Sequence, residues 1–249
     1  MNIGLIGTGN IGGCLARKLI GAGHRVLLAN SRGPESLSDL AAEVGATAVV
    51  VTDLARQCDI VVVAVPMKSI LELPANLFDD ASDNLIIVDT GNYLSIRDGL
   101  IEPLENGLAE SRWVEQRLGR PVVKAFNNVG ADSLANGGRP KGSPERFALP
   151  VAGDDKWAKD VVLDLIEEIG FDGVDAGDLD ESWRQQPGSP AFCTNLDASR
   201  LAAVLQRLDE ADRARLPELR DVALQKIMQL PNPSLARDTV PLFRSLAGL

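Results

Sequence analysis

The chain has no apolar run long enough to cross a membrane. Its longest apolar runs, residues 60–65 and 85–88, have the length of strands and fall well short of the roughly 18 residues that a membrane helix needs. The first residues also lack the basic region and apolar core of a secretory signal peptide. We therefore expect a cytoplasmic protein that has no membrane partner.

Cysteine and positive charge are scarce as well. Cys14, Cys58 and Cys193 are widely spaced and odd in number, which argues against a disulfide framework and against a metal cluster. The formal net charge of −10 at pH 7 repels nucleic acid and anionic lipid surfaces. We expect no metal site and no nucleic-acid partner, and any anionic ligand must be held by a local group of donors.

Side chains that donate or accept protons near neutral pH are few, because the chain has one histidine and one tyrosine. His24 follows Gly23 at the start of an expected strand, where we expect a structural role, whereas Tyr93 at a strand end is a candidate substrate contact. Lys124 and Asn127 share an expected strand that would place them on opposite faces, so we assign them no joint catalytic role. The catalytic acid or base stays unknown. This scarcity favours hydride transfer between two rings, which needs mainly orientation.

Short apolar runs alternate with helical stretches over the first 150 or so residues, as in a parallel sheet covered by helices on both faces. The stretch 10–22 has apolar residues at helical spacing and lies between the first two of these runs. The expected strands are 2–6, 25–29, 47–51, 60–65, 85–89 and 122–126. The sequence therefore predicts a Rossmann-type, doubly wound α/β fold.

A glycine-rich segment, Gly7-Thr8-Gly9-Asn10-Ile11-Gly12, directly follows the first expected strand and opens the first expected helix. This is the setting that the dinucleotide-binding pattern G-x-G-x-x-G requires. Gly7 would allow the tight turn, Gly9 the approach of a pyrophosphate to the backbone, and Gly12 the close packing of helix and strand. The phosphates would bind free amide groups at the positive end of the helix dipole, and a purely structural turn is the alternative.

The end of the second strand indicates which dinucleotide binds. Binders of NAD usually carry an acid there, but this strand ends in Asn30, Ser31 and Arg32. A hydroxyl and a guanidinium suit the 2′-phosphate of NADP, although Glu35 lies just beyond. In the alternative interpretation Arg32 is a solvated surface charge.

Two further strand ends belong to the same carboxyl edge of the sheet, where ligands of doubly wound folds bind. The fourth strand ends with Ala64 and Val65 and is followed by Met67, and the fifth is followed by Asn92. These four residues are candidate cofactor contacts.

These segments together resemble the F420-dependent NADP reductases, whose dinucleotide domain also occurs in metalloreductases of the STEAP type. The resemblance rests on residues 3–12, 30–32, 64–66 and 122–127 and continues through 151–155 and 174–179. It implies that NADP(H) occupies the amino-terminal domain and that the deazaflavin F420 stacks on the nicotinamide in a cleft closed by the smaller carboxyl-terminal part. It also implies cofactor contacts at Thr8, Asn10, Ile11, Ser31, Arg32, Ala64 and Met67, and it places Leu179 beside the hydride site.

The pattern changes after Pro140, where turn residues precede an expected strand at 148–152, a helix at 155–169 and a short strand near Val174. An irregular loop is expected at 176–194 and a further helix at 196–207. We divide the chain into an NADP-binding domain (1–148), a smaller α/β part that closes the acceptor cleft (149–208) and a helical carboxyl-terminal extension (209–249).

The loop 178–194 is expected to cover the open face of the nicotinamide and so to determine which molecule receives the hydride. Trp183 and Phe192 would offer stacking surfaces, Arg184 an anchor for an acidic acceptor, and Pro190 a constraint on the path of the loop. In the alternative, Trp183 fills the core between the domains. The complete set of candidate substrate contacts is Tyr93, Asn127, Leu179, Trp183, Arg184, Pro190 and Phe192.

The extension after residue 208 carries more apolar surface than a solvated tail should, and we expect it to pack on its own subunit or across a homodimer interface. Its apolar residues include Leu216, Leu219, Val222, Ala223, Leu230, Val240, Leu242, Phe243 and Leu246.

The expected function is hydride transfer between NADP(H) and a small-molecule redox acceptor, either F420 or a related flavin. A reductase that uses NADPH to reduce a small carbonyl or imine is the second enzyme interpretation. A module that senses NADP(H) without turnover is the third, because a fold never guarantees chemistry.

Overall fold

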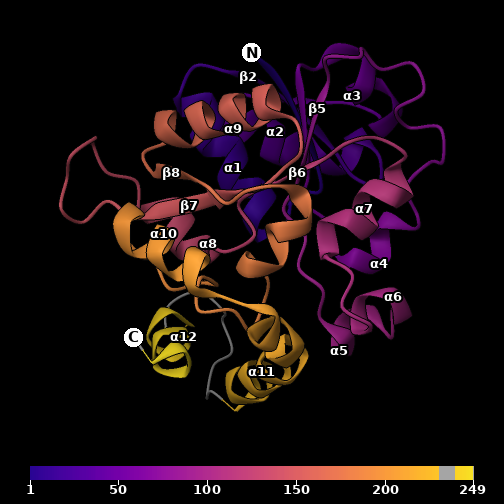
Figure 1. The fold of residues 1–249 in the computed structure, drawn as a ribbon. Coiled ribbons are helices and arrows are strands. Elements are labelled where there is room, and N and C mark those ends of the chain that lie inside the picture. Colours follow the sequence, from indigo (N-terminus) through magenta and orange to yellow (C-terminus); the bar gives the residue numbers. More distant parts are fainter. Residues whose placement is uncertain (230–238, 249) are drawn as a thin grey trace.

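A computed structural model of the chain describes residues 1–229 and 239–248 (Figure 1). Its main feature is a six-stranded parallel sheet with the strand order β3-β2-β1-β4-β5-β6. This is the order of the Rossmann fold, so the predicted fold class is confirmed. The strands are β1 (Asn2–Ile6), β2 (Arg25–Ala29), β3 (Thr47–Ala48), β4 (Ile60–Val63), β5 (Ile86–Asp89) and β6 (Val123–Lys124).

Three strands of the large sheet end earlier than the sequence predicted. The expected strand 47–51 stops at Ala48 because a helix begins at Val51, and the expected strand 60–65 stops at Val63. The expected strand 122–126 is reduced to two residues, and Phe126 adopts a positive φ of 61°. A side chain in this left-handed region is incompatible with a continuing strand, so the chain turns there.

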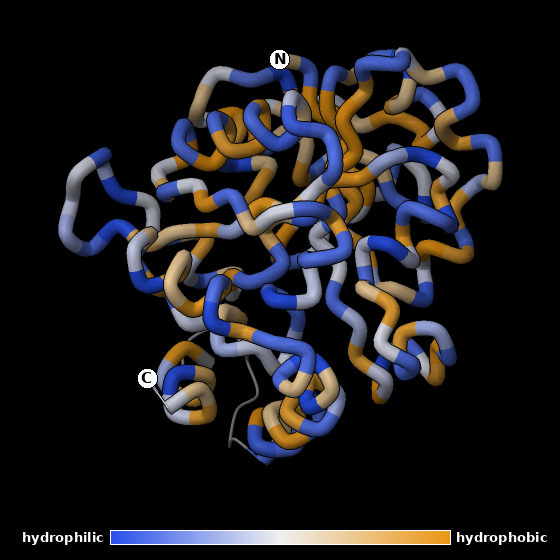
Figure 2. Tube along the Cα trace, in the orientation of Figure 1, coloured by the Kyte–Doolittle hydropathy of each residue, from blue (hydrophilic) through white to orange (hydrophobic). Residues whose placement is uncertain are grey.

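Helices cover both faces of the large sheet, because side chains along each strand alternate between two core clusters. One cluster holds Ile3 and Leu5 of β1 together with side chains of α1, α2, α8 and α9 (Lys156–Glu168). The other holds Ile6 of the same strand together with side chains of α3, α4, α6 and α7. Figure 2 shows the hydrophobic residues following the strands through the interior. The helices that precede residue 148 are α1 (Asn10–Gly21), α2 (Ser38–Val44), α3 (Val51–Gln57), α4 (Met67–Ile70), α5 (Ser95–Asp98), α6 (Glu102–Glu105), α7 (Glu110–Leu118) and α8 (Ala131–Asn136), with a 3-10 turn η1 (Pro34–Leu37).

The second part of the chain adds a small parallel sheet of β7 (Ala148–Val151) and β8 (Asp172–Asp175). Between these strands lies α9 (Lys156–Glu168), whose first turn is capped by the Asp155 side chain. A 3-10 helix, η2 (Leu179–Gln185), and α10 (Ala198–Arg207) follow. The expected irregular loop 176–194 therefore contains a helical segment, whose Leu179 and Trp183 are buried in the core.

The extension consists of α11 (Glu210–Met228) and α12 (Thr239–Ala247), which lie side by side in Figure 1. Asp209 and Asp212 form a capping box at the start of α11. Ala223 and Phe243 are buried with Cys193, so the extension packs on its own chain, one of the two expected arrangements. Leu230 lies outside the described residues, and the homodimer stays a prediction.

Among the residues that the structure describes, no helix combines the length and apolar character that spanning a membrane requires.

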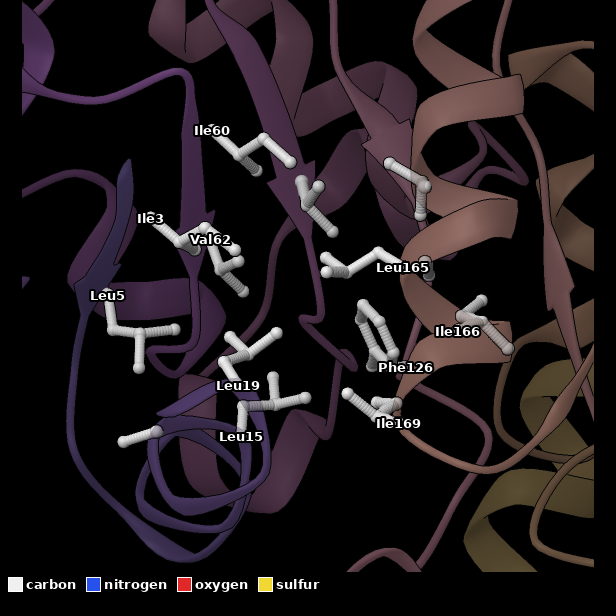
Figure 3. Packing of buried hydrophobic residues seen from close by; sticks show 14 of the residues in the cluster. Ile3, Leu5, Leu15, Leu19, Ile60, Val62, Phe126, Leu165, Ile166 and Ile169 are labelled. Carbon is white, nitrogen blue, oxygen red and sulfur yellow. The ribbon is translucent and has the colours of Figure 1, made fainter. Parts of the chain in front are cut away.

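The first core cluster crosses the predicted boundary at residue 148. Figure 3 shows Phe126 between Leu19 of α1 and two side chains of α9, Leu165 and Ile166. All four are fully or almost fully buried. The division into domains stays a prediction, but residues on both sides of it share one core.

We predict that Leu165→Ala lowers the free energy of unfolding by about 2–5 kcal/mol, because it removes a fully buried side chain from this shared core. Urea unfolding followed by circular dichroism and by tryptophan fluorescence should show one common transition at a lower midpoint. Val161→Ala, at a half-buried site of the same helix, is the control and should cost less. Two separate transitions in the parent protein would contradict the shared core.

Candidate cofactor and acceptor cavity

The glycine-rich loop between β1 and α1 depends on two glycines for its shape. Gly7 has a φ of +94°, and a Cβ placed on it would lie 2.5 Å from the carbonyl oxygen of Ala64. A Cβ on Gly12 would lie 2.1 Å from the carbonyl oxygen of Gly7. Any larger residue would therefore separate α1 from the strand that precedes it.

The third glycine faces open space instead. A Cβ on Gly9 would meet nothing within 4 Å, and the residue is exposed at the N-cap of α1. No side chain caps this helix, and its first turn contains no acid. Its free backbone N–H groups and the positive end of its dipole are thus available to an anion, which fits the pyrophosphate of a dinucleotide.

A cavity of about 920 Å³ runs from this loop across the carboxyl edge of the sheet. Separate stretches of the chain form it: the loop with α1, Leu40 of α2, the residues after β5, the residues after β6 with α8, the loop before α10, and the extension. Its lining comprises Thr8, Gly9, Asn10, Ile11, Gly13, Cys14, Arg17, Leu40, Asn92, Leu94, Arg97, Asn127, Val129, Gly130, Ala131, Asp132, Ala135, Pro187, Phe192, Cys193, Arg220, Ala223, Leu224, Ile227 and Phe243. Its volume is in the usual range of pockets that bind small molecules.

Asn30, Ser31 and Arg32 lie outside this lining, at the end of β2. Asn30 shapes the turn, because its side chain accepts a hydrogen bond from the Arg32 backbone N–H (2.9 Å) and donates one to Ser36 Oγ (2.9 Å). Ser31 and Arg32 are exposed. Within the described residues, no carboxylate pairs with the Arg32 guanidinium, and Glu35, three residues later in the chain, is exposed. The guanidinium is therefore available to a phosphate.

The candidate contacts at the end of β4 do not reach the cavity. Ala64 and Val65 are half-buried, and the Met67 side chain is fully buried in the second core cluster. Only the backbone of Met67 could face a cofactor, so the structure gives its side chain a packing role.

Two asparagines meet where β5 and β6 end, at the floor of the cavity. Asn92 Nδ2 donates to the Asn127 backbone carbonyl (2.9 Å), and Asn127 Nδ2 donates to Asn92 Oδ1 (3.0 Å). Gln185 Nε2 donates to Asn127 Oδ1 (2.9 Å) from below. These bonds fix both amides at the edge where the sheet binds ligands.

A buried group of charges supports this floor. Lys124 Nζ donates to Asp89 Oδ2 (3.1 Å) and to the Gly91 carbonyl, and Ser111 Oγ donates to Asp89 Oδ2 (2.7 Å). Glu110 Oε2 lies 3.6 Å from Lys124 Nζ, and each of these charged side chains is almost completely buried. Burial raises the pKa of Glu110 to about 7 against the opposing attraction of Lys124.

The expectation that Lys124 and Asn127 occupy opposite faces of one strand is wrong. The strand ends at Lys124, and the left-handed turn at Phe126 redirects the chain. Lys124 then bonds the Gly91 carbonyl while Asn127 bonds the neighbouring Asn92. Lys124 has no exposed surface, so it supports the floor of the cavity without lining it.

The predicted substrate contacts separate into two groups. Asn127 and Phe192 line the cavity, whereas Tyr93, Leu179 and Trp183 are buried in the cores. The Tyr93 hydroxyl donates to Glu105 Oε1 (2.8 Å), which leaves it turned away from the cavity. The structure therefore favours the alternative in which Trp183 fills the core.

The remaining two residues of the predicted acceptor loop also lie away from the cavity. Arg184 pairs with Glu181 and lies 5.2 Å from the Trp183 ring. Pro190 borders a separate cavity of about 190 Å³ beneath the extension. The loop is fixed by Arg112, which pairs with Asp154 and with Asp180 at 2.8 Å each.

Sequence reasoning missed the side chains of the extension that line the cavity, together with Arg17, Arg97 and Val129. The apolar residues of the extension predicted that it packs against another surface, but they did not indicate which surface they cover. The sequence carries no local signal for a contact between residues this far apart.

Comparison with known proteins supports the identification of the first strands and helices as those of an NADP oxidoreductase. The family model described as NADP oxidoreductase, coenzyme F420-dependent, matches residues 2–93. Protein YjhV of Escherichia coli (strain K12) is 41% identical over 101 residues, which cover 40% of this chain and 66% of YjhV.

Two crystal structures are similar over most of the chain. The hypothetical protein SMa0349 of Sinorhizobium meliloti is 33% identical, with a TM-score of 0.67 over 79% of this chain and 95% of the other. An Arthrobacter sp. FB24 protein, provisionally assigned as an F420-dependent NADP reductase, is 22% identical, with a TM-score of 0.63 over 94% and 96% of the two chains. At 22% identity, the similarity to the Arthrobacter protein shows a shared fold.

We predict that the buried Glu110 makes stability fall as pH rises. Its pKa is raised in the folded state, so its contribution is fully present below its unfolded pKa near 4.5 and is lost as pH rises through about 7. Glu110→Gln removes the titration while keeping the shape, and should unfold at higher denaturant than the parent at pH 8 but not at pH 5.

The measurement is the urea midpoint between pH 5 and pH 8, and the expected gain at pH 8 is on the order of 1–3 kcal/mol. Glu115→Gln, a half-buried position on the same helix, is the control and should not reproduce the pH dependence. A gain of equal size at pH 5 and pH 8 would contradict the assignment.

Proposed function

Because the chain belongs to the family of coenzyme F420-dependent NADP oxidoreductases, we propose that it transfers a hydride between NADP(H) and a deazaflavin or flavin ring. One observation carries the proposal: a single cavity joins the glycine-rich loop to the Asn92–Asn127 pair and then continues into an apolar end. A dinucleotide on the loop would thus leave room for a second molecule in the same space.

The residues present fit NADP(H). The exposed Gly9 and the uncapped start of α1 would hold the pyrophosphate, with Thr8, Asn10 and Ile11 beside it. The exposed Arg32 would hold the 2′-phosphate through charge-assisted hydrogen bonds, with the neighbouring Ser31 hydroxyl. The Asn92 and Asn127 amides would border the nicotinamide, because they lie at the carboxyl ends of the central strands.

The chemistry of the lining favours a ring acceptor. Among the described residues that line the cavity, the ionisable side chains are Arg17, Arg97, Arg220, Asp132 and two cysteines. Burial raises the pKa of Cys193 to about 12 and also raises that of Cys14, so both are poor proton donors near pH 7. Reduction of a carbonyl or imine generally needs a positioned donor, and the lining includes no histidine, lysine or tyrosine within the described residues.

NADPH, when bound, supplies a hydride, which the acceptor ring takes up together with one proton from water as NADP⁺ forms. The protein's own contribution is to orient the two rings and to exclude other reactions from the cavity.

The function is tested by following NADPH oxidation with F420, with FMN and with a set of small cyclic imines and carbonyls. We expect turnover with a flavin-type ring and little with the imines or carbonyls. The opposite preference would replace the proposed acceptor by a small carbonyl or imine, and tight NADPH binding with no oxidation by any of them would favour a sensing module.

The choice of NADP over NAD is tested by Arg32→Ala. Loss of a hydrogen bond to a charged group costs roughly 1.5–3 kcal/mol, so the affinity for NADPH should fall about 10- to 100-fold. The affinity for NADH should hardly change. Isothermal titration with both cofactors measures the effect.

Arg25→Ala provides the control, because Arg25 is an exposed arginine at the opposite end of the same strand. It should leave both affinities unchanged. Equal binding of NADPH and NADH by the parent protein would refute the role of Arg32.

A further inference from the structure

The apolar end of the cavity is built largely from the carboxyl-terminal extension. Leu224 and Ile227 of α11 and Phe243 of α12 line it, facing Phe192 of the preceding loop. The Phe192 and Phe243 rings form an edge-to-face pair with centroids 5.1 Å apart. Val129, just before α8, and Ala135, within α8, also line the cavity.

Three arginines hold the extension in this place. Arg220 of α11 is almost completely buried, bonds Glu105 (3.2 Å) and lies 4.9 Å from the Tyr93 ring. Arg213 of α11 donates to the Gly107 carbonyl (2.8 Å). Both contacts join α11 to the segment that follows β5.

The second helix is held to the loop before α10. Arg244 Nε donates to the Thr194 carbonyl (2.8 Å), and Arg244 Nη2 donates to the Asn195 carbonyl (3.1 Å). Gly188 also lets the backbone of α11 come close, since a Cβ there would lie 2.6 Å from the Leu216 carbonyl oxygen. The extension is therefore a fixed part of the cavity wall.

The charged side chains of the lining offer little to an anionic acceptor. Arg17 pairs with Glu43 (2.7 Å) and Arg97 with Asp98 (2.8 Å). Arg220 lies between two carboxylates, since it also pairs with Asp221 (2.9 Å). Each lining arginine thus already has an acidic partner, and Asp132 adds a negative charge in the first turn of α8.

We propose that α11 and α12 form the wall that selects the acceptor, and that this wall accepts an uncharged, flat, largely apolar ring. This inference rests on the proposed function and names the part of the acceptor that the chain recognises. Aromatic and aliphatic side chains would contact the faces and edges of the ring. A charged substituent on the same acceptor would have to extend away from this wall, because burying it here without a free partner is unfavourable.

The experiment measures binding without turnover. Lumiflavin, an uncharged tricyclic ring, is titrated into the full-length protein saturated with NADP⁺, and its fluorescence reports the complex. FMN carries the same ring with a phosphate and is titrated in the same way. With NADP⁺ and oxidised flavin present there is no hydride to transfer, so the affinities report recognition alone.

Leu224→Trp fills the apolar end and should weaken lumiflavin binding about 10- to 100-fold, because overpacking costs roughly 1–3 kcal/mol. Leu219→Trp, on the same helix but bordering the separate cavity, is its control. Phe243→Ala removes half of the ring pair and should also weaken lumiflavin binding, whereas Leu246→Ala on the same helix should not. Melting temperatures confirm that each variant is folded, and the affinity for NADP⁺ should stay unchanged.

The outcomes separate this inference from the proposed function. Failure of NADP⁺ to bind the parent protein would refute the proposed function itself. The acceptor wall would be refuted if NADP⁺ binds normally and neither Leu224→Trp nor Phe243→Ala changes the affinity for lumiflavin. Binding of FMN that is much tighter than that of lumiflavin would overturn the uncharged class, because it would require a free cation in the wall.

Discussion

The contact between Gly12 and the carbonyl of Gly7 sets the geometry on which the cavity depends. The two backbones approach so closely that a Cβ on Gly12 would come within 2.1 Å of this oxygen. Because Gly12 has no Cβ, the first turn of α1 can pack directly against the backbone at the end of β1. The start of the helix therefore lies at the carboxyl edge of the sheet. The uncapped N–H groups of α1 then face the cavity.

The opposite end of the cavity depends on a different kind of interaction. The buried guanidinium of Arg220 joins α11 to Glu105 and to the Tyr93 ring. Tyr93 in turn bonds Glu105, so the side chain at the end of β5 serves as an attachment point for the extension. A tyrosine that looked like a substrate contact in the sequence therefore helps to shape the site from behind.

The fold was largely predictable from the sequence, whereas the acceptor end of the site was not. Buried parallel strands appear in the sequence as short runs of β-branched residues, and the glycine spacing of the first loop specifies a local turn. Both signals are contained in a few consecutive residues. The exposed Arg32 also follows directly from its position after β2.

The acceptor end depends on contacts between distant parts of the chain. Trp183 was a reasonable stacking surface, but the ion pairs of Arg112 hold its helical turn against the body. Phe243 lines the cavity in an α12 that is held by the bond of Arg244 to Thr194 and by the contact of Phe243 with Phe192. Likewise, the left-handed Phe126 that brings Lys124 and Asn127 to the same floor has no signature in the local sequence.

The two ends of the cavity also become available at different times. Thr8 and Phe243 line one space although almost the whole described chain lies between them. A ribosome makes the chain from its amino end, so the glycine-rich loop and the first strands emerge long before α11 and α12. The glycine-rich loop is therefore made well before the helices that line the apolar end of the cavity.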